Sequence, residues 1–219
     1  MTTAEPAAGK APARERVYAW LRDSIISGEI EEGRFLDEQA VSGTAGVSRT
    51  PVREAFHRLA AERFISLLPR KGAQVRTVTA RELEEVYQSR RLIEGHAVST
   101  VVASGTGAPG EMTELLGPME SAGAAGDWFE TVRLDRGFHR AVVAAAGNSV
   151  LTELYDALQS RQQRVGLRAV RARPERLETI NAEHRALVAA LDRADEQGAL
   201  RVLDQHLRPV PEVTALLPD

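Results

Sequence analysis

Residues 46–65, GVSRTPVREAFHRLAAERFI, decide the fold of the amino-terminal part of the chain. Ser48 stands where a helix N-cap is expected, and Pro51 falls in the first turn, where a missing amide hydrogen costs little. Apolar residues then recur at the spacing of one helix face: Val52, Ala55, Phe56 and Leu59. The stretch therefore predicts a helix with one buried face and one free face.

The flanking sequence places this helix third in a small domain. Residues 14–27 have a helical apolar pattern that ends at Gly28, and Asp37 can cap a short second helix that Gly46 closes. After the third helix, two β-prone runs in FISLLPRKGAQVRTV flank a turn at Arg70-Lys71-Gly72. Three helices and a hairpin predict a winged helix-turn-helix over residues 14–78, preceded by a flexible arm over residues 1–13.

Charge is unevenly distributed along the chain. The net charge is −3, but residues 1–78 hold 12 Lys and Arg against 10 Asp and Glu, whereas residues 79–219 hold 16 against 21. Within residues 49–76, seven basic residues face only Glu54 and Glu62. A basic face of this kind is typical of a phosphate-binding surface, although charge alone is equally compatible with a solvated patch.

The third helix carries the candidate DNA-reading residues. Arg49 and Arg53 are four residues apart, so both project from one face near the helix N-terminus, where base-reading side chains are expected. The planar fork of arginine can bond O6 and N7 of guanine together. We expect Ser48 and Thr50 to reach phosphates. At the tip of the wing, Lys71 and Gly72 are predicted to approach the DNA backbone or minor groove.

Residues 79–208 show no convincing strand pattern and predict an all-α bundle of six helical segments. Thr79, Asp127 and Ser149 are the expected N-caps of the first, third and fourth segments, and Pro174 opens the fifth. Residues 209–219 form a C-terminal tail. The fold class is thus mostly α: an amino-terminal winged helix-turn-helix followed by a six-helix bundle that we expect to be an effector domain. The six segments span about residues 79–103, 112–122, 127–146, 149–171, 174–194 and 196–207.

The bundle contains a candidate metal site. His139, His184 and His206 fall on three different predicted helices, each in an apolar stripe, and Asp135 lies one turn before His139. Four such groups in one interior are costly unless they are paired or bound to metal. Three imidazoles and a carboxylate suit a divalent transition ion, zinc above all, with nickel or manganese also compatible. Taken singly, each histidine also fits a core imidazole bonded to a neighbour. We interpret His57 and His96 as packing or surface residues.

Composition excludes several classes of protein. With 43% hydrophobic and 27% charged residues the chain resembles an ordinary globular protein, and no apolar run approaches the length of about 18 residues that spans a bilayer. The first residues lack the apolar core of a secretion signal, so we expect a cytoplasmic location and no membrane partner. The absence of cysteine rules out disulfides and thiolate metal ligands.

Two groups of motifs resemble one family. Residues 46–65 together with RKGAQV at 70–75 look like the DNA-binding signature of the GntR superfamily of bacterial transcription regulators, from which the chain departs at Gln39, often a basic residue in relatives. DRGFH, AGNSVL, INAEHRALVAALDRAD and VLDQHL resemble the helical FCD effector domain of the FadR branch, over about residues 79–208. The helix count is more similar to the VanR-type subgroup than to the longer acyl-CoA-binding type.

The resemblance implies functional residues. Metal-binding members of the family use an aspartate and three histidines, and these positions fall on Asp135, His139, His184 and His206. The family's arginine near the pocket falls on Arg90, where a guanidinium beside a metal would suit a carboxylate ligand. An ion pair between Arg90 and Glu94, one helical turn away, is the alternative.

These observations predict a regulator of transcription, a repressor by the commonest behaviour of such families, that binds a palindromic operator in double-stranded DNA as a homodimer. Its affinity for the operator would depend on a small organic acid bound at the metal. One alternative is a metal-dependent hydrolase, although no HExxH motif or appended nucleophile supports it. Another is a DNA-binding regulator with a purely structural histidine cluster and no effector.

Overall fold

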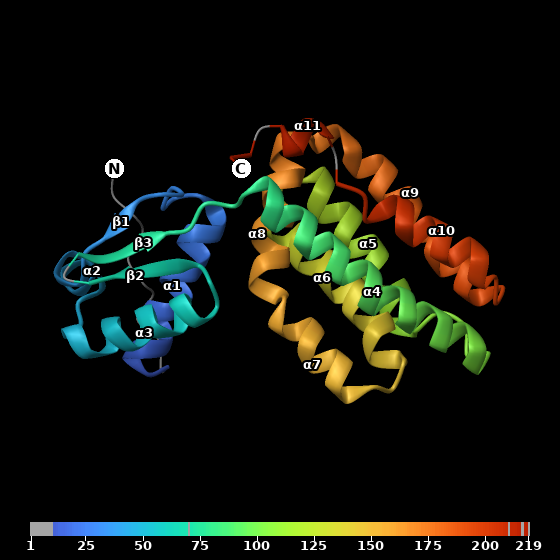
Figure 1. The fold of residues 1–219 in the computed structure, drawn as a ribbon, viewed down its shortest axis with the longest axis horizontal. Coiled ribbons are helices and arrows are strands. Elements are labelled where there is room, and N and C mark those ends of the chain that lie inside the picture. Colours follow the sequence, from blue (N-terminus) through green and yellow to red (C-terminus); the bar gives the residue numbers. More distant parts are fainter. Residues whose placement is uncertain (1–10, 70, 210, 216, 219) are drawn as a thin grey trace. The chain divides into compact units, whose positions relative to one another are not determined.

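The structure, a computed structural model, describes residues 11–69, 71–209, 211–215 and 217–218. The chain divides into two compact units, Met1–Val78 and Thr79–Asp219, which are described separately. Figure 1 shows that the strands lie in the first unit and that the second unit is helical. The sheet has three strands. The predicted fold class, a winged helix-turn-helix followed by a helical bundle, is confirmed. No helix in the described ranges has the length and apolar character needed to cross a membrane.

The three helices of the first unit follow their local signals. They are α1 (Ala13–Ser27), α2 (Glu38–Ala45) and α3 (Arg49–Ala61). Gly28 ends α1 in the left-handed region at φ 81°, and the Asp37 side chain accepts hydrogen bonds from the amides of Gln39 and Ala40 at the start of α2. Ser48 occupies the N-cap position of α3, but its hydroxyl makes no capping hydrogen bond there. The Ser48 hydroxyl is therefore not engaged by the helix that it precedes.

The wing contains one strand more than the sequence predicts. Strands β2 (Ile65–Leu68) and β3 (Gly72–Val75) form the expected antiparallel hairpin, and β1 (Phe35–Leu36) adds to the other edge of β3, so the order is β1-β3-β2. In the register of the β1 pair, Leu36 lies opposite Ala73. Arg70 of the predicted turn, like residues 1–10 of the predicted arm, lies outside the described residues. A two-residue strand escapes prediction because its pairing partner, and not its own pattern, creates it.

Gly72 is required where β3 begins. Its φ is +83°, and a Cβ atom placed there would lie 2.3 Å from the backbone oxygen of Leu36. Only glycine allows this close approach of β1 to β3. Beneath the sheet, α1 and α3 pack together around Leu21, Phe56 and Leu59, all of which are at most 1% exposed. One face of α3 is therefore buried against α1, while Arg49, Arg53 and His57 on the opposite side are exposed.

The second unit is helical throughout its described residues. The predicted caps Thr79 and Asp127 are confirmed, since their side chains accept from the amides of Glu82 and Glu130. The cap predicted at Ser149 is instead Asn148, which accepts from the amide of Leu151. The helices are α4 (Ala80–Ser104), α5 (Gly110–Ala124), α6 (Trp128–Ala145), α7 (Ser149–Ala157), α8 (Gln159–Ala172), the 3-10 turn η1 (Pro174–Arg176), α9 (Leu177–Asp192), α10 (Glu196–His206) and α11 (Pro211–Thr214).

Two details differ from the six predicted segments. The fourth segment is interrupted at Leu158, whose amide bonds the carbonyl of Tyr155 at 3.0 Å in place of an i−4 partner, so α7 and α8 are separate helices. Neither glycine nor proline marks this break, which leaves no local signal for it. The predicted tail contains the short helix α11; residues 210, 216 and 219 lie outside the described ranges.

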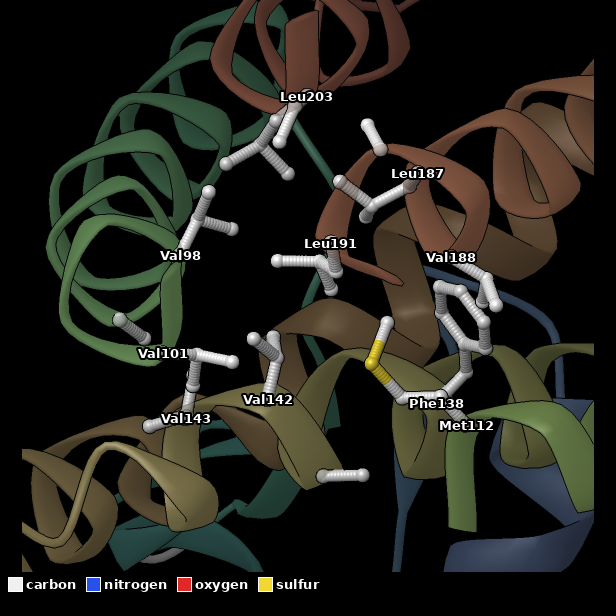
Figure 2. Packing of buried hydrophobic residues seen from close by; sticks show 14 of the residues in the cluster. Val98, Val101, Met112, Phe138, Val142, Val143, Leu187, Val188, Leu191 and Leu203 are labelled. Carbon is white, nitrogen blue, oxygen red and sulfur yellow. The ribbon is translucent and has the colours of Figure 1, made fainter. Parts of the chain in front are cut away.

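The bundle packs around α6, which contacts α4, α5, α7 and α8, while α10 packs on α4 and α9. Figure 2 shows the core where these helices meet, with Phe138 of α6 and Met112 of α5 adjoining Leu187 and Leu191 of α9. Phe138 is fully buried and its ring centroid lies 4.5 Å from that of His184. The apolar core thus continues directly into the histidine cluster and fixes the helices that carry it.

Candidate functional site

The structure brings together the four predicted metal ligands. Asp135 and His139 come from α6, His184 from α9 and His206 from α10, and one ligand atom of each lies within 4.8 Å of the others. Nε2 of His139 is 3.2 Å from Nε2 of His184 and 3.1 Å from Nε2 of His206. Oδ1 of Asp135 is 3.2 Å from Nε2 of His184. Three imidazole nitrogens and one carboxylate oxygen therefore converge on one point.

Carboxylates lie behind two of the imidazoles. Nδ1 of His139 lies 2.7 Å from Oε2 of Glu94, without the geometry of a hydrogen bond, and Nδ1 of His206 is hydrogen-bonded to Oε2 of Glu183 at 2.9 Å. A carboxylate oxygen can only accept, so Nδ1 of His206 carries the proton and its Nε2 presents a lone pair to the cluster. This carboxylate–histidine arrangement is the usual support of a metal-bound imidazole.

Burial favours the uncharged form of two of the imidazoles. It lowers the pKa of His184 to about 4 and also lowers the pKa of His139. Burial by itself would raise the pKa of Asp135, but the adjacent imidazoles of His184 and His139 hold it below its usual range. The close approach of three Nε2 atoms and a carboxylate oxygen is the arrangement in which one cation could accept a lone pair from each of the four groups. The donor set therefore fits a divalent transition metal.

Glu94 joins the cluster to Arg90. Its side chain is completely buried, and Oε1 accepts from Nε of Arg90 and from the hydroxyl of Tyr155, each at 2.7 Å. Burial would raise the pKa of Glu94, yet Arg90 and His139 lower it to about 2. Arg90 thus forms the ion pair predicted as one alternative. Its Nη2, buried without a hydrogen-bond partner among the described residues, remains able to donate to a ligand, and the side chain lines the cavity described next.

A cavity of about 80 Å³ adjoins the cluster. Its floor includes Asp135, His206 and Arg90, and its apolar wall includes Val132, Val165 and Leu177. A site of this volume is smaller than those that hold drug-sized ligands, about 300–1,000 Å³. It suits a molecule of a few carbon atoms.

In the first unit, the candidate DNA-reading residues line a separate groove. Arg49 and Arg53 at the start of α3 border it together with Gly72 of the wing. Both arginines are exposed; Nη2 of Arg49 donates to Oε1 of Gln39 at 2.8 Å, and Nε of Arg53 pairs with Oε2 of Glu38 at 2.7 Å. A side chain of α2 thus orients each arginine and leaves most N–H donors of the guanidinium group free.

The remaining predicted contacts lie at the same end of the unit. Ser48 and Thr50 are exposed next to Arg49, and Lys71 is exposed beside Gly72 at the tip of the wing. His57 is exposed and also lines the groove, and His96 is exposed on α4, outside the histidine cluster. The start of α3 and the tip of the wing therefore both expose polar side chains.

Comparison with known families identifies both units. The model of the gntR family of bacterial regulatory proteins matches residues 13–75, and that of the FCD domain matches residues 85–209, more than half of the chain. The chain belongs to the GntR family of bacterial regulatory proteins. Members of this family regulate transcription by binding DNA, so the GntR chain is a DNA-binding regulator and not the hydrolase of the first alternative.

Relatives resemble this GntR regulator along most of their length. The gluconate operon transcriptional repressor of Bacillus licheniformis is 30% identical over 89% of the chain and 82% of its own length. The repressor GlaR of Escherichia coli is 28% identical over 89% and 92%. Among solved structures, a GntR regulator from Rhodococcus sp. RHA1 superposes with a TM-score of 0.73 at 26% identity, covering 89% of this chain and 93% of its own. The winged helix and FCD bundle are therefore common to these proteins.

Two polar residues of this GntR regulator's site, Glu183 and Tyr155, were not predicted from the sequence. Glu94 was predicted as a partner of Arg90, but not as a neighbour of the histidine cluster. Glu183 directly precedes His184, yet it faces His206 of the next helix. Tyr155 bonds Glu94 from α7, which is 61 residues away in sequence. Only the position of Glu94 one turn after Arg90 gave a local signal, because the other contacts depend on which helices are neighbours.

Proposed function

We propose that this regulator is a metal-dependent repressor that binds a palindromic operator as a homodimer and responds to a small organic acid. The observation that carries the proposal is the convergence of Asp135, His139, His184 and His206 beside a small cavity. Arg90 lines the same cavity, and its Nη2 has no hydrogen-bond partner among the described residues. A negative charge bound there would interact with both the metal and the guanidinium.

The metal has a limited role in this proposal. Bound to the four side chains, a divalent ion would act as a Lewis acid that attracts an oxygen of the effector. Four protein ligands complete a tetrahedral zinc site, so effector coordination calls for a higher coordination number, which nickel and manganese accept readily. The histidine set is the feature that favours the VanR-type subgroup, since α7 and α8 are separate helices and the count of six predicted segments is not met in the described bundle.

The relatives support repression as the direction of control. GlaR, the gluconate operon repressor and the D-xylose utilization operon repressor of Paenarthrobacter nicotinovorans are all named as repressors. By analogy, acid binding to the FCD domain would lower operator affinity. The effector must therefore bind the two states of the regulator with different affinity, since equal affinity shifts no equilibrium.

Metal content tests the proposal first. Protein purified without added metal should contain close to one equivalent of zinc, nickel or manganese per chain, and His206→Gln should lose most of it. His96→Gln removes an exposed histidine of the same unit and should retain the metal. Less than about a tenth of an equivalent in a folded wild-type chain would leave the histidines with a structural role only.

DNA reading is tested separately. After selection of an operator from random duplexes, Arg49→Ala or Arg53→Ala should each weaken it by about 1–3 kcal/mol and relax the base preference at one position of the half-site. Unspecific duplex DNA provides the comparison, because a base-reading side chain contributes little there. Full operator affinity in both variants would exclude α3 as the reader.

A further inference from the structure

More arginines line the cavity of the FCD unit than are paired with carboxylates among the described residues. Asp135 is its one acidic lining residue among those described, whereas five arginines border it. Three of these have acidic partners: Arg90 with Glu94, Arg173 with Glu175, and Arg208 with Asp204. The side chains of Arg136 and Arg176 have no acidic partner within 4.0 Å in the described part of the chain. The pocket therefore holds positive charge beyond what one carboxylate would balance.

Arg136 is the less well compensated of these two. Its Nε is inaccessible to solvent and has no hydrogen-bond partner among the described residues. The nearby carboxylate of Asp156 is already held by two bonds from Arg140, at 2.7 and 2.9 Å. An anion that enters the cavity can therefore accept from the inaccessible and unpaired Nε of Arg136.

Gln162 provides a second unused donor to the same cavity. The residue is 6% exposed, lines the cavity from α8, and its Nε2 has no partner in the described ranges. At the contact between α6 and α8, a Cβ atom on Gly166 would lie 3.1 Å from Val132. Arg136 and Gln162 are each one helical turn from this contact. Two buried donors, one of them charged, are therefore free on two packed helices.

We infer that Arg136 and Gln162 form a subsite for a second anionic group of the effector, which makes the effector a short dicarboxylic acid. The inference rests on the proposed function, in which the first carboxylate lies near the metal and Arg90. A terminal carboxylate has lone pairs enough to accept from both Arg136 and Gln162. A methyl group in its place would leave both donors buried and unpaired, which is the arrangement that gives polar sites strong discrimination.

Matched acids test the subsite. Malate and 2-hydroxybutyrate have the same carbon chain and the same 2-hydroxy acid group, and differ by one terminal carboxylate; 2-hydroxyglutarate and 2-hydroxyvalerate form a longer pair. Calorimetric titration of the full chain loaded with nickel should give at least about tenfold tighter binding for the dicarboxylate of one pair. Arg136→Gln should remove this preference and leave monocarboxylate binding intact.

Two further variants sharpen the result. Arg133→Gln changes an exposed arginine of the same helix that pairs with Glu130, and it should keep the preference. Arg176→Gln should also keep it. Equal affinities within both pairs, an unchanged preference in Arg136→Gln, or loss of the preference in Arg176→Gln alone would overturn the assignment, as would failure of a metal-loaded chain to bind any of the four acids.

The outcome is separable from that of the proposed function. A chain that retains no metal contradicts the proposed metal site, but neither Arg136 nor Gln162 belongs to the ligand set. The same acid pairs titrated into that metal-free chain still decide the subsite: a dicarboxylate preference that Arg136→Gln abolishes supports it, and no preference overturns it. Unchanged thermal unfolding of Arg136→Gln shows that the variant is folded.

Discussion

Replacing Glu94 with glutamine is the most severe conservative change that the structure identifies. Glu94 is completely buried and contacts Arg90, Tyr155 and His139, each at 2.7 Å. The amide keeps the shape of the side chain but loses the charge. Arg90 then lacks its counter-charge in the interior, and the new NH2 group faces donors that it cannot satisfy.

The expected magnitude follows from the burial of the pair. Removing one partner of a buried ion pair costs about 3–5 kcal/mol, so Glu94→Gln should lose a large part of the free energy of unfolding. The matched control is Glu85→Gln on the same helix. Glu85 also pairs with an arginine one turn away, Arg81, but the side chains are 84% and 58% exposed in that pair against 8% and 0% for Arg90 and Glu94. An exposed pair of this kind contributes little to stability, because solvent screens both charges.

Urea unfolding of metal-free protein, followed by circular dichroism, measures this difference. Metal competition titrations measure a second effect, because weakening the support of a liganding histidine should reduce metal affinity about 10- to 100-fold. If Glu94→Gln does not fold, Tyr155→Phe removes a single hydrogen bond to the carboxylate and should cost about 1.5–3 kcal/mol. A loss below about 1 kcal/mol in Glu94→Gln would refute the buried network as a source of stability.

Three further changes have defined outcomes. Gly72→Ala would place Cβ 2.3 Å from the Leu36 oxygen at φ +83° and should destabilise the winged helix by more than about 2 kcal/mol in urea unfolding. Its control, Gly33→Ala, has φ +79° with free space around the new Cβ atom and should cost only about 1 kcal/mol. Phe138→Ala empties a fully buried site and should cost about 3–5 kcal/mol by the same assay; a smaller loss would mean that the core collapses to fill it. Lys71→Ala should weaken all DNA sequences alike and reduce the slope of log affinity against log salt by about 0.9, and an unchanged slope would mean that the exposed lysine does not contact a phosphate.

The sequence predicted those helix ends that are fixed by contacts between neighbouring residues. Asp37, Thr79 and Asp127 were predictable as caps because each side chain bonds an amide two or three residues ahead. Strand β1 and the break at Leu158 were not predictable, since a strand of two residues exists only through β3 and the break has no glycine or proline to mark it. Asn148 and Ser149 can both cap a helix, and Asn148 occupies the N-cap position of α7.

Only part of the candidate site could be predicted from the sequence. The four ligands could be proposed because each is a histidine or aspartate in an apolar stripe, and the resemblance to the FCD domain assigned the same four. Their convergence could not be derived from the sequence, because it depends on how α6, α9 and α10 pack. Glu183 and Tyr155 were missed for the same reason. The sequence does not distinguish Arg136 and Gln162 from other polar residues, because only the structure shows that each has a buried N–H donor without a partner among the described residues.

The shared carboxylate of Glu94 has a consequence for metal retention. One oxygen contacts Arg90, which lines the cavity, and the other lies 2.7 Å from Nδ1 of His139, a ligand of the proposed metal site. An anion that draws Arg90 toward itself changes the charge that Glu94 presents to His139, so the two binding equilibria are thermodynamically linked. Because linkage is reciprocal, a metal that tightens acid binding is itself held more tightly by the same factor when the acid is present. Dialysis to equilibrium should therefore leave less metal on the chain in acid-free buffer than in buffer that contains the effector.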